Sequence, residues 1–209
     1  MSLGALIVLA AILSCSGFML WVVLYVLPRR QRDQQSNLLK VFGAAVELRF
    51  PGHEGMTDQV ATKCVEVGKE LGLNERELHQ LEQAARLRDI GLCAIPWKLV
   101  NERPQCEWTP AEKATYERHS EVSGAMLEMV PSLCDLASIV RNHHTPIGSG
   151  EVPLASRIIA VVDAYVVNER QQGSLVARTL LEQERGQTLD PHVVDACFRV
   201  LPSDRVASA

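Results

Sequence analysis

Three imidazoles and two carboxylates stand out in this chain as side chains that could do chemistry. They are Asp89, His119, His143, His144 and Asp163. Asp163 interrupts an otherwise apolar run, and a buried carboxylate is costly unless it is paired, hydrogen-bonded or bound to a metal. Together the five side chains form a nitrogen and oxygen ligand set suited to Fe, Mn or Zn. Each also has an ordinary structural explanation by itself, so a shared metal site is a hypothesis that spacing alone leaves open.

The elements that position these side chains are predicted to be α-helices, because apolar residues recur at helical rather than strand spacing. The pattern predicts helices over residues 57–71, 75–87, 110–129, 133–144, 153–168, 174–185 and 191–200. Asn74 and Glu77 form a capping-box pattern before the second of these. Thr109, Pro110 and Glu112 form an N-cap pattern before the third. Residues 153–168 could also form a buried strand, but their length favours a helix. We therefore expect an all-α domain.

The first part of the chain is predicted to be a transmembrane helix. Leu3–Leu27 is a run of 25 uncharged residues, which as a helix would span roughly 37 Å, more than the hydrocarbon core of a bilayer. Trp21 and Tyr25 lie near its end, and the basic cluster Pro28–Arg32 follows. The positive-inside rule then places the C-terminal domain in the cytoplasm, with a single-pass anchor in the inner, cytoplasmic membrane. A cleaved signal peptide is the alternative, but it usually has a charged n-region, which this sequence lacks.

Composition excludes several other classes of protein. The 209 residues carry 21 Lys and Arg against 25 Asp and Glu, a net charge of −4, and 47% of them are hydrophobic. This balance excludes a disordered or collagen-like chain. The sequence pI of about 5.9 argues against a partner that is a nucleic-acid polymer, since such binding requires basic surface. The cysteines form no C-x-x-C pair, so a zinc ribbon is not supported either.

The remaining chain suits one domain with a linker. We expect a juxtamembrane linker over residues 28–50, a helical domain over 51–201 and a tail over 202–209. The linker contains apolar residues among polar ones. It could be a helix leading from the anchor to the domain, a contact between two copies, or a helix packed on its own domain, which we favour.

Five ordered segments of the chain resemble the HD superfamily of phosphohydrolases, and specifically its HD-GYP branch. They are residues 84–91, which read AARLRDIG, together with 109–119, 139–144, 153–165 and 186–194. The longest match is 153–165, PLASRIIAVVDAY, against the family pattern P-L-x-A-R-I-I-A-V-A-D-A-Y. The resemblance implies an all-α HD-domain bundle of about seven helices. It also implies two or three bound metal ions, and hydrolysis of cyclic di-GMP by a metal-activated hydroxide.

The chain departs from the family pattern at the positions of several functional residues. Met56 aligns with the first histidine of the family, and His53 lies three residues too early to replace it. Arg88 replaces the histidine of the HD doublet, and Leu92 replaces the lysine that follows. The GYP loop is absent, since only six residues separate His144 from Glu151.

The resemblance implies that one of the two metal positions has lost its nitrogen ligands. The ligands that remain are Asp89, His119, His143, His144 and Asp163. A guanidinium offers no lone pair to a metal near neutral pH, but its charge could replace the missing cation. We therefore hypothesise a site for one ion, Fe, Mn or Zn, with His144 as an auxiliary ligand and Asp163 paired to Arg88. Asp89 would be both a metal ligand and the catalytic carboxylate.

Three functions are compatible with this pattern. The first is a membrane-anchored, degenerate HD-GYP-like domain with little or no phosphodiesterase activity. It would act in signalling by binding a cyclic dinucleotide, another phosphoester or a protein partner. The second is a residual phosphohydrolase with a one-metal site, which would depend on Asp89. The third is a purely structural domain that holds a partner, for which His143 and Asp163 would be dispensable.

Overall fold

The computed structural model describes residues 2–50, 53–102 and 107–201 of the chain. The chain divides into two compact units, one up to Leu38 and the other from Leu39 onward. All regular structure in these described ranges is helical, and the single β-bridge, between Arg185 and Leu189, is isolated. The prediction of an all-α fold is therefore confirmed.

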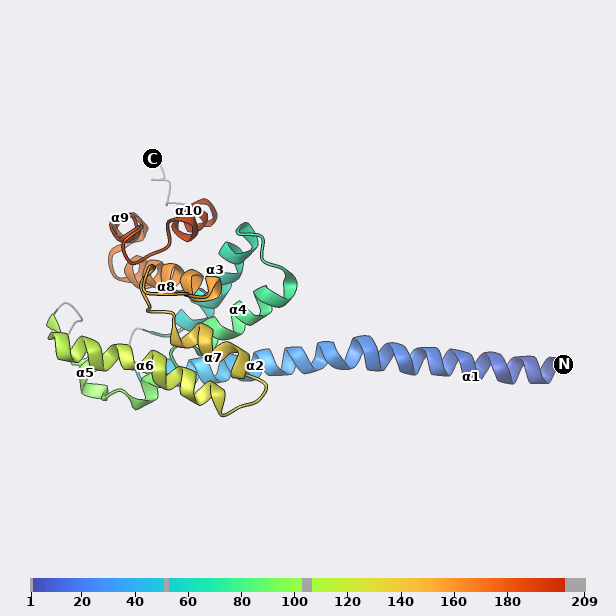
Figure 1. Ribbon diagram of the computed structural model, residues 1–209. Helices are drawn as coiled ribbons and strands as arrows, with labels where there is room; N and C mark the ends of the chain where they lie inside the picture. Colours follow the sequence, from blue (N-terminus) through green and yellow to red (C-terminus); the bar gives the residue numbers. More distant parts are fainter. Residues whose placement is uncertain (1, 51–52, 103–106, 202–209) are drawn as a thin grey trace, which may run out of the picture. The chain divides into compact units, whose positions relative to one another are not determined.

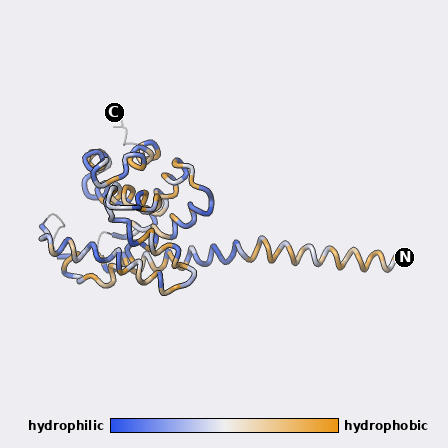
Figure 2. The backbone as a smooth tube through the Cα atoms, in the orientation of Figure 1, coloured by the Kyte–Doolittle hydropathy of each residue, from blue (hydrophilic) through white to orange (hydrophobic). Residues whose placement is uncertain are grey.

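The first unit is one continuous helix that extends into the second. It consists of α1 (Leu3–Trp21), a π-helical turn η1 (Val22–Val26) and the beginning of α2 (Leu27–Glu47). Figure 2 shows the apolar character of α1 and the change to hydrophilic residues in α2. By length and composition this is the one helix among the described residues that could cross a membrane. A signal sequence near an N-terminus has the same properties.

Eight further α-helices and one short 3₁₀-helix lie in the described part of the second unit (Figure 1). They are α3 (Met56–Glu70), α4 (Glu75–Leu87), η2 (Ile90–Ala94), α5 (Trp97–Asn101), α6 (Pro110–Glu128), α7 (Cys134–Arg141), α8 (Leu154–Gln172), α9 (Ser174–Glu184) and α10 (Pro191–Val200). All seven helices predicted in the domain are present. The sequence did not predict α5 and η2, because five residues are too few to show a helical repeat.

The core of the second unit lies around α3 and α8. Helix α3 packs against α4, α8 and α10, while α6 packs against α7 and η2. Val60, Cys64 and Val67 of α3 are fully buried, and they recur at the spacing of one helix face. The apolar run of α8 is also buried, and that helix continues to Gln172, beyond the expected end at 168. It ends at Gly173, whose φ of +87° favours glycine.

Helix α7 ends earlier than predicted. The expected helix over 133–144 extends only from Cys134 to Arg141, so His143 and His144 lie in the loop that follows. Asn142 is the C-cap, and Pro146 lies shortly after it. The backbone N–H of Asn142 donates to the carbonyls of Ser138 and Val140, and the chain leaves the helix there. This departure turns both histidines toward α6.

Glu47, at the end of α2, joins that helix to the beginning of α3. Its carboxylate accepts a hydrogen bond of 2.8 Å from the backbone N–H of Gly55 and another from that of Thr57. An anion is favourable at this place because the N-terminus of a helix carries partial positive charge. Gly43 lies close by, where a Cβ atom would meet Thr57 Cγ2 at 2.7 Å. The last part of α2 is therefore packed on the helical unit.

Replacing Glu47 with alanine should lower the free energy of unfolding by about 1–2 kcal/mol, because two N–H groups at the start of α3, those of Gly55 and the buried Thr57, would lose their acceptor. Urea denaturation of the full chain in detergent, followed by tryptophan fluorescence, measures this change. Glu66→Ala is the control, since Glu66 is an exposed glutamate on α3, the helix that Glu47 caps. Equal midpoints for the two variants would contradict the capping role of Glu47.

Candidate metal centre

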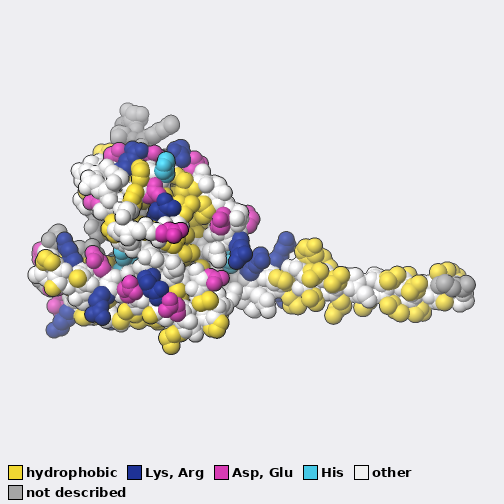
Figure 3. Space-filling view, in the orientation of Figure 1, with side chains coloured by type: hydrophobic (Ala, Val, Ile, Leu, Met, Phe, Trp, Pro, Cys, Tyr) yellow, Lys and Arg dark blue, Asp and Glu magenta, His cyan; other side chains and the backbone are white. Residues whose placement is uncertain are grey.

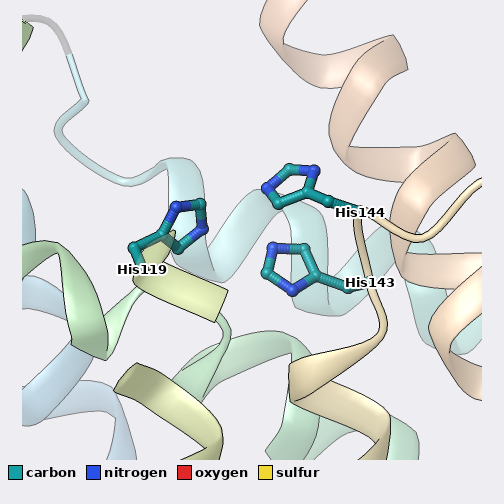
Figure 4. A group of neighbouring side chains, drawn as sticks. All are labelled: His119, His143 and His144. Atoms are coloured by element: carbon teal, nitrogen blue, oxygen red, sulfur yellow. The ribbon is translucent and has the colours of Figure 1, made fainter. Parts of the chain in front are cut away.

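Three histidines from two separate segments meet in the second unit. His119 comes from α6, and His143 and His144 come from the loop after α7. One ring nitrogen from each lies within 4.8 Å of the other two. Figure 4 shows the three rings around a common space. His119 and His143 are fully buried, whereas His144 is exposed. Nitrogen atoms at this separation can bind a single ion.

Backbone carbonyls determine which nitrogen of each buried ring is available. His119 Nδ1 lies 2.7 Å from the carbonyl oxygen of Tyr116, and His143 Nδ1 lies 2.6 Å from that of Val140. A carbonyl oxygen can only accept, so each Nδ1 carries a proton, and in the neutral ring the lone pair is then on Nε2. A hydrogen bond from the second ring nitrogen is the usual arrangement for a metal-ligating histidine.

The two Nε2 atoms are buried and have no hydrogen-bond partner within the described residues. The nearest acidic atom to His119 Nε2 is Asp89 Oδ1 at 3.5 Å, outside hydrogen-bond geometry. An unsatisfied buried polar atom costs about 1–3 kcal/mol. A divalent metal ion would satisfy both lone pairs at once, so these residues fit the ligand set that the sequence suggested.

Arg88 lies between the two carboxylates of the site. It is the C-cap residue of α4, and its side chain is only 1% exposed. Its Nη2 is 2.9 Å from Asp89 Oδ2 and 2.8 Å from Asp163 Oδ1, and its Nε donates to the same Asp163 oxygen at 2.9 Å. Its Nη1 donates to the carbonyl of Ala85 at 2.9 Å. This guanidinium therefore gives both carboxylates a cationic partner.

The charges of these groups follow from their surroundings. Burial would lower the pKa of Arg88, but Asp163 and Asp89 outweigh it and hold that pKa above its ordinary value. Burial would raise the pKa of Asp89, but the charge of Arg88 and the contact with His119 together outweigh burial and hold that pKa well below its usual range. Burial, together with the neighbouring His144, holds the pKa of His143 well below its ordinary value. His143 is thus neutral, the form that binds metals.

The structure places the five predicted ligands in two adjoining groups. Asp89 lies at the edge of the three-histidine cluster through its Oδ1 atom, while its Oδ2 atom contacts Arg88. Asp163, from α8, is paired with Arg88, and it is not among the residues whose ligand atoms form the histidine cluster. Asp89 is therefore the carboxylate that connects the cluster to the ion pair.

The contact between η2 and α6 sets the distance from Asp89 to His119. The N–H of Gly91 donates to Ser123 Oγ at 2.8 Å, and Ser123 Oγ donates to the carbonyl of Arg88 at 2.8 Å. A Cβ atom at Gly91 would lie 2.1 Å from the carbonyl oxygen of His119, so a larger residue could not approach as closely. Glycine is thus required here for close packing of two backbones, although its φ is negative.

A cavity of about 270 Å³ opens beside the ion pair. Its lining residues are His53, Met56, Arg88, Asp89, Leu92, Tyr116, Asp163, Val167, Arg170 and Gln171. Met56 and His53 both line it, so the position where the resemblance expects a histidine is a thioether on the cavity wall. Tyr116 and Arg170 were not among the predicted site residues. Their spacing could have indicated them, because Tyr116 precedes His119 by one helical turn and Arg170 follows Asp163 by two.

Two comparisons with known proteins agree with this geometry. The family described as HD domain matches residues 40–193 of the chain. The cyclic di-GMP phosphodiesterase response regulator RpfG of Xanthomonas campestris pv. campestris (strain 8004) is 27% identical over 187 residues, which cover 81% of this chain and 48% of that protein. The chain thus spans about half the length of this curated relative. Both findings confirm the resemblance to HD-GYP-like phosphohydrolases.

Proposed function

Because this chain belongs to the HD domain family, we propose that it is a membrane-anchored, HD-GYP-like binding module with little or no cyclic di-GMP phosphodiesterase activity. The observation that carries this proposal is the position of Arg88 between Asp89 and Asp163. A buried guanidinium holds a fixed positive charge there and offers no lone pair or exchangeable site for a second metal. The chain would therefore keep a positive charge at the first metal position, but it would lack the chemistry that a metal ion supplies there.

The loss of one metal position should suppress hydrolysis. In two-metal sites the ions stabilise both the attacking and the leaving oxygen of the displacement. Each 1.4 kcal/mol of lost transition-state stabilisation lowers the rate about tenfold, so losing one ion should cost orders of magnitude. Arg88 can balance charge but cannot lower the pKa of a bound water, as a metal does.

We further propose that the histidine cluster binds one divalent ion, Fe, Mn or Zn. His119 and His143 would hold it through Nε2, with Asp89 as a third ligand and His144 as an auxiliary one. Such an ion would supply Lewis-acid stabilisation of a bound phosphate. The protein itself supplies cationic side chains, Arg88 and Arg170, on the wall of the adjoining cavity. Asp89 and Asp163 lie on the same wall, so the charges there balance, and it is the name of the relative that supports a cyclic dinucleotide as the ligand.

The anchor completes the proposal. The apolar residues 3–27 would cross the inner membrane once, and Arg29, Arg30 and Arg32 would remain on the cytoplasmic side with the helical domain. Figure 3 shows hydrophobic side chains along this segment and basic side chains directly after it. Ligand binding or a protein partner would then be sensed at the cytoplasmic face of the membrane.

The test is a paired measurement on the purified full chain in detergent. Calorimetric titration with cyclic di-GMP, after loading with Mn²⁺, should show saturable binding, while chromatography of the same mixture should show no linear product above the protein-free blank. Binding should weaken in Arg170→Ala, which removes one cationic side chain from the cavity. Absence of binding would overturn the proposed ligand.

A residual phosphohydrolase is the second candidate, favoured by the two unpartnered Nε2 atoms that fit a metal. It predicts metal-dependent turnover of a phosphodiester that is abolished by Asp89→Asn. Turnover of this kind by the wild-type chain would replace the binding proposal. If neither binding nor turnover changed in His143→Ala and Asp163→Asn, while Val162→Asp in the core abolished membrane-associated function, the domain would be purely structural.

A further inference from the structure

The end of α2 has two apolar faces, and only one of them is covered by its own domain. Leu39 and Gly43 are buried against the helical unit. Leu38, Val41 and Phe42 point elsewhere and are 60%, 66% and 53% exposed. Exposed apolar residues clustered on one helix face are uncommon unless the face binds something.

The exposed face has the spacing of a coiled-coil seam. Leu38, Val41, Ala45 and Leu48 follow one another in steps of three, four and three residues. This is the repeat of 3.5 residues that keeps the a and d positions of a heptad facing a partner helix. The buried residues Leu39 and Gly43 occupy the b and f positions of the same heptad, away from the seam. One helix can therefore pack on its own domain and on a second helix at once.

We propose that α2, with Leu48 directly after its last residue, pairs with the same segment of a second copy of this chain, in a parallel two-stranded coiled coil over Leu38–Leu48. The seam contains no charged residue, so two identical copies can face each other there without like-charge repulsion. The same side chains meet across a two-fold axis, as an interface between identical copies requires.

The orientation of the pair follows from the anchor, and to that extent it rests on the proposed function. Helix α2 continues the helix that contains the apolar residues 3–27. Copies inserted in one membrane share the same direction, so their α2 helices are parallel. A seam of 11 residues is short for a free coiled coil, but confinement to a membrane raises the effective concentration of the second helix. The pairing requires neither the metal site nor hydrolysis.

Cysteine cross-linking in membranes that contain the full chain tests this interface. Leu38→Cys and Val41→Cys, oxidised with copper phenanthroline, should each form a covalent dimer of twice the chain mass at a yield at least about fivefold above wild type. The wild-type chain sets the baseline for its own cysteines. Lys40→Cys is the matched control, because Lys40 is exposed on the same helix but lies off the seam.

Three outcomes would overturn the proposal. One is a yield for Leu38→Cys no higher than that for Lys40→Cys. Another is a cross-linked product that contains a different protein, identified by mass spectrometry. The third is a product from Leu38→Cys that forms only when Leu48→Cys is co-expressed, as antiparallel helices would require. Adding Val41→Asp to Leu38→Cys should lower the yield several-fold, whereas adding Lys40→Asp should not. Failure here would leave the ligand and metal measurements unaffected, so the two proposals fail separately.

Discussion

Arg88→Leu should lower the free energy of unfolding by about 3–5 kcal/mol, the usual cost of leaving a buried charge without its partner. The substitution removes the guanidinium that contacts Asp89 and Asp163, and it leaves two carboxylates facing each other in a largely buried site. Urea denaturation of the full chain in detergent gives the change directly. The free energy of unfolding of Arg88→Lys should lie between those of the wild type and Arg88→Leu, because an ammonium keeps the charge but loses the planar fork of donors.

The control for this prediction is Arg118→Leu, since Arg118 is exposed on α6. Its effect should lie within about 0.5 kcal/mol of zero, as for most surface substitutions. If Arg88 acts as a substitute cation, adding Mn²⁺ should restore part of the free energy of unfolding that Arg88→Leu loses. Mn²⁺ should produce no such gain in Arg118→Leu. An Arg88→Leu variant as stable as the wild type would show that the ion pairs do not hold the site together.

The second large effect is expected at the metal centre. His143→Ala should weaken binding of Mn²⁺ or Zn²⁺ by at least about 100-fold, because loss of an outer-shell partner alone typically costs 10- to 100-fold. Metal analysis of purified protein should then give about one ion per chain for the wild type and close to none for the variant. The physical reason is that the Nε2 lone pair of His143, which the Val140 carbonyl keeps available, would be lost.

His192→Ala is the matched control for the metal measurement, because His192 is exposed on α10. It should retain the wild-type metal content. Circular dichroism separates loss of a ligand from loss of fold, since His143→Ala must keep its helical signal for the comparison to count. A folded His143→Ala variant with unchanged metal affinity would remove the histidine cluster from the proposed site.

The two effects act on different parts of one site. Arg88 balances the carboxylates on the side of the cavity, while His143 and His144, whose pKa values are lowered by burial, offer neutral nitrogen ligands on the other side of Asp89. Arg88→His should accordingly lower the free energy of unfolding and also supply a possible metal ligand, because it would place an imidazole beside Asp89 and Asp163. Together with Met56→His, which changes the cavity wall, it would restore both histidines that the family pattern has there.

The sequence by itself determined the helices and the candidates for the site, because their signals are local. Asn74 and Thr109 cap α4 and α6 as predicted, since an N-cap side chain bonds to backbone within three residues of itself. The early end of α7 escaped prediction, because apolar spacing indicates that a helix exists far better than it indicates where the helix ends.

Only the tertiary structure decided what the five candidate ligands do. Arg88 and Asp163 are 75 residues apart in the chain, so their pairing was a hypothesis from the family resemblance, and the atoms that make the contact are visible only in the folded chain. Likewise, the free Nε2 atoms of His119 and His143 depend on where the carbonyls of Tyr116 and Val140 point after folding. Such contacts arise from the packing of α4, α6 and α8, and the direction of a side chain is fixed by that packing rather than by its neighbours in sequence.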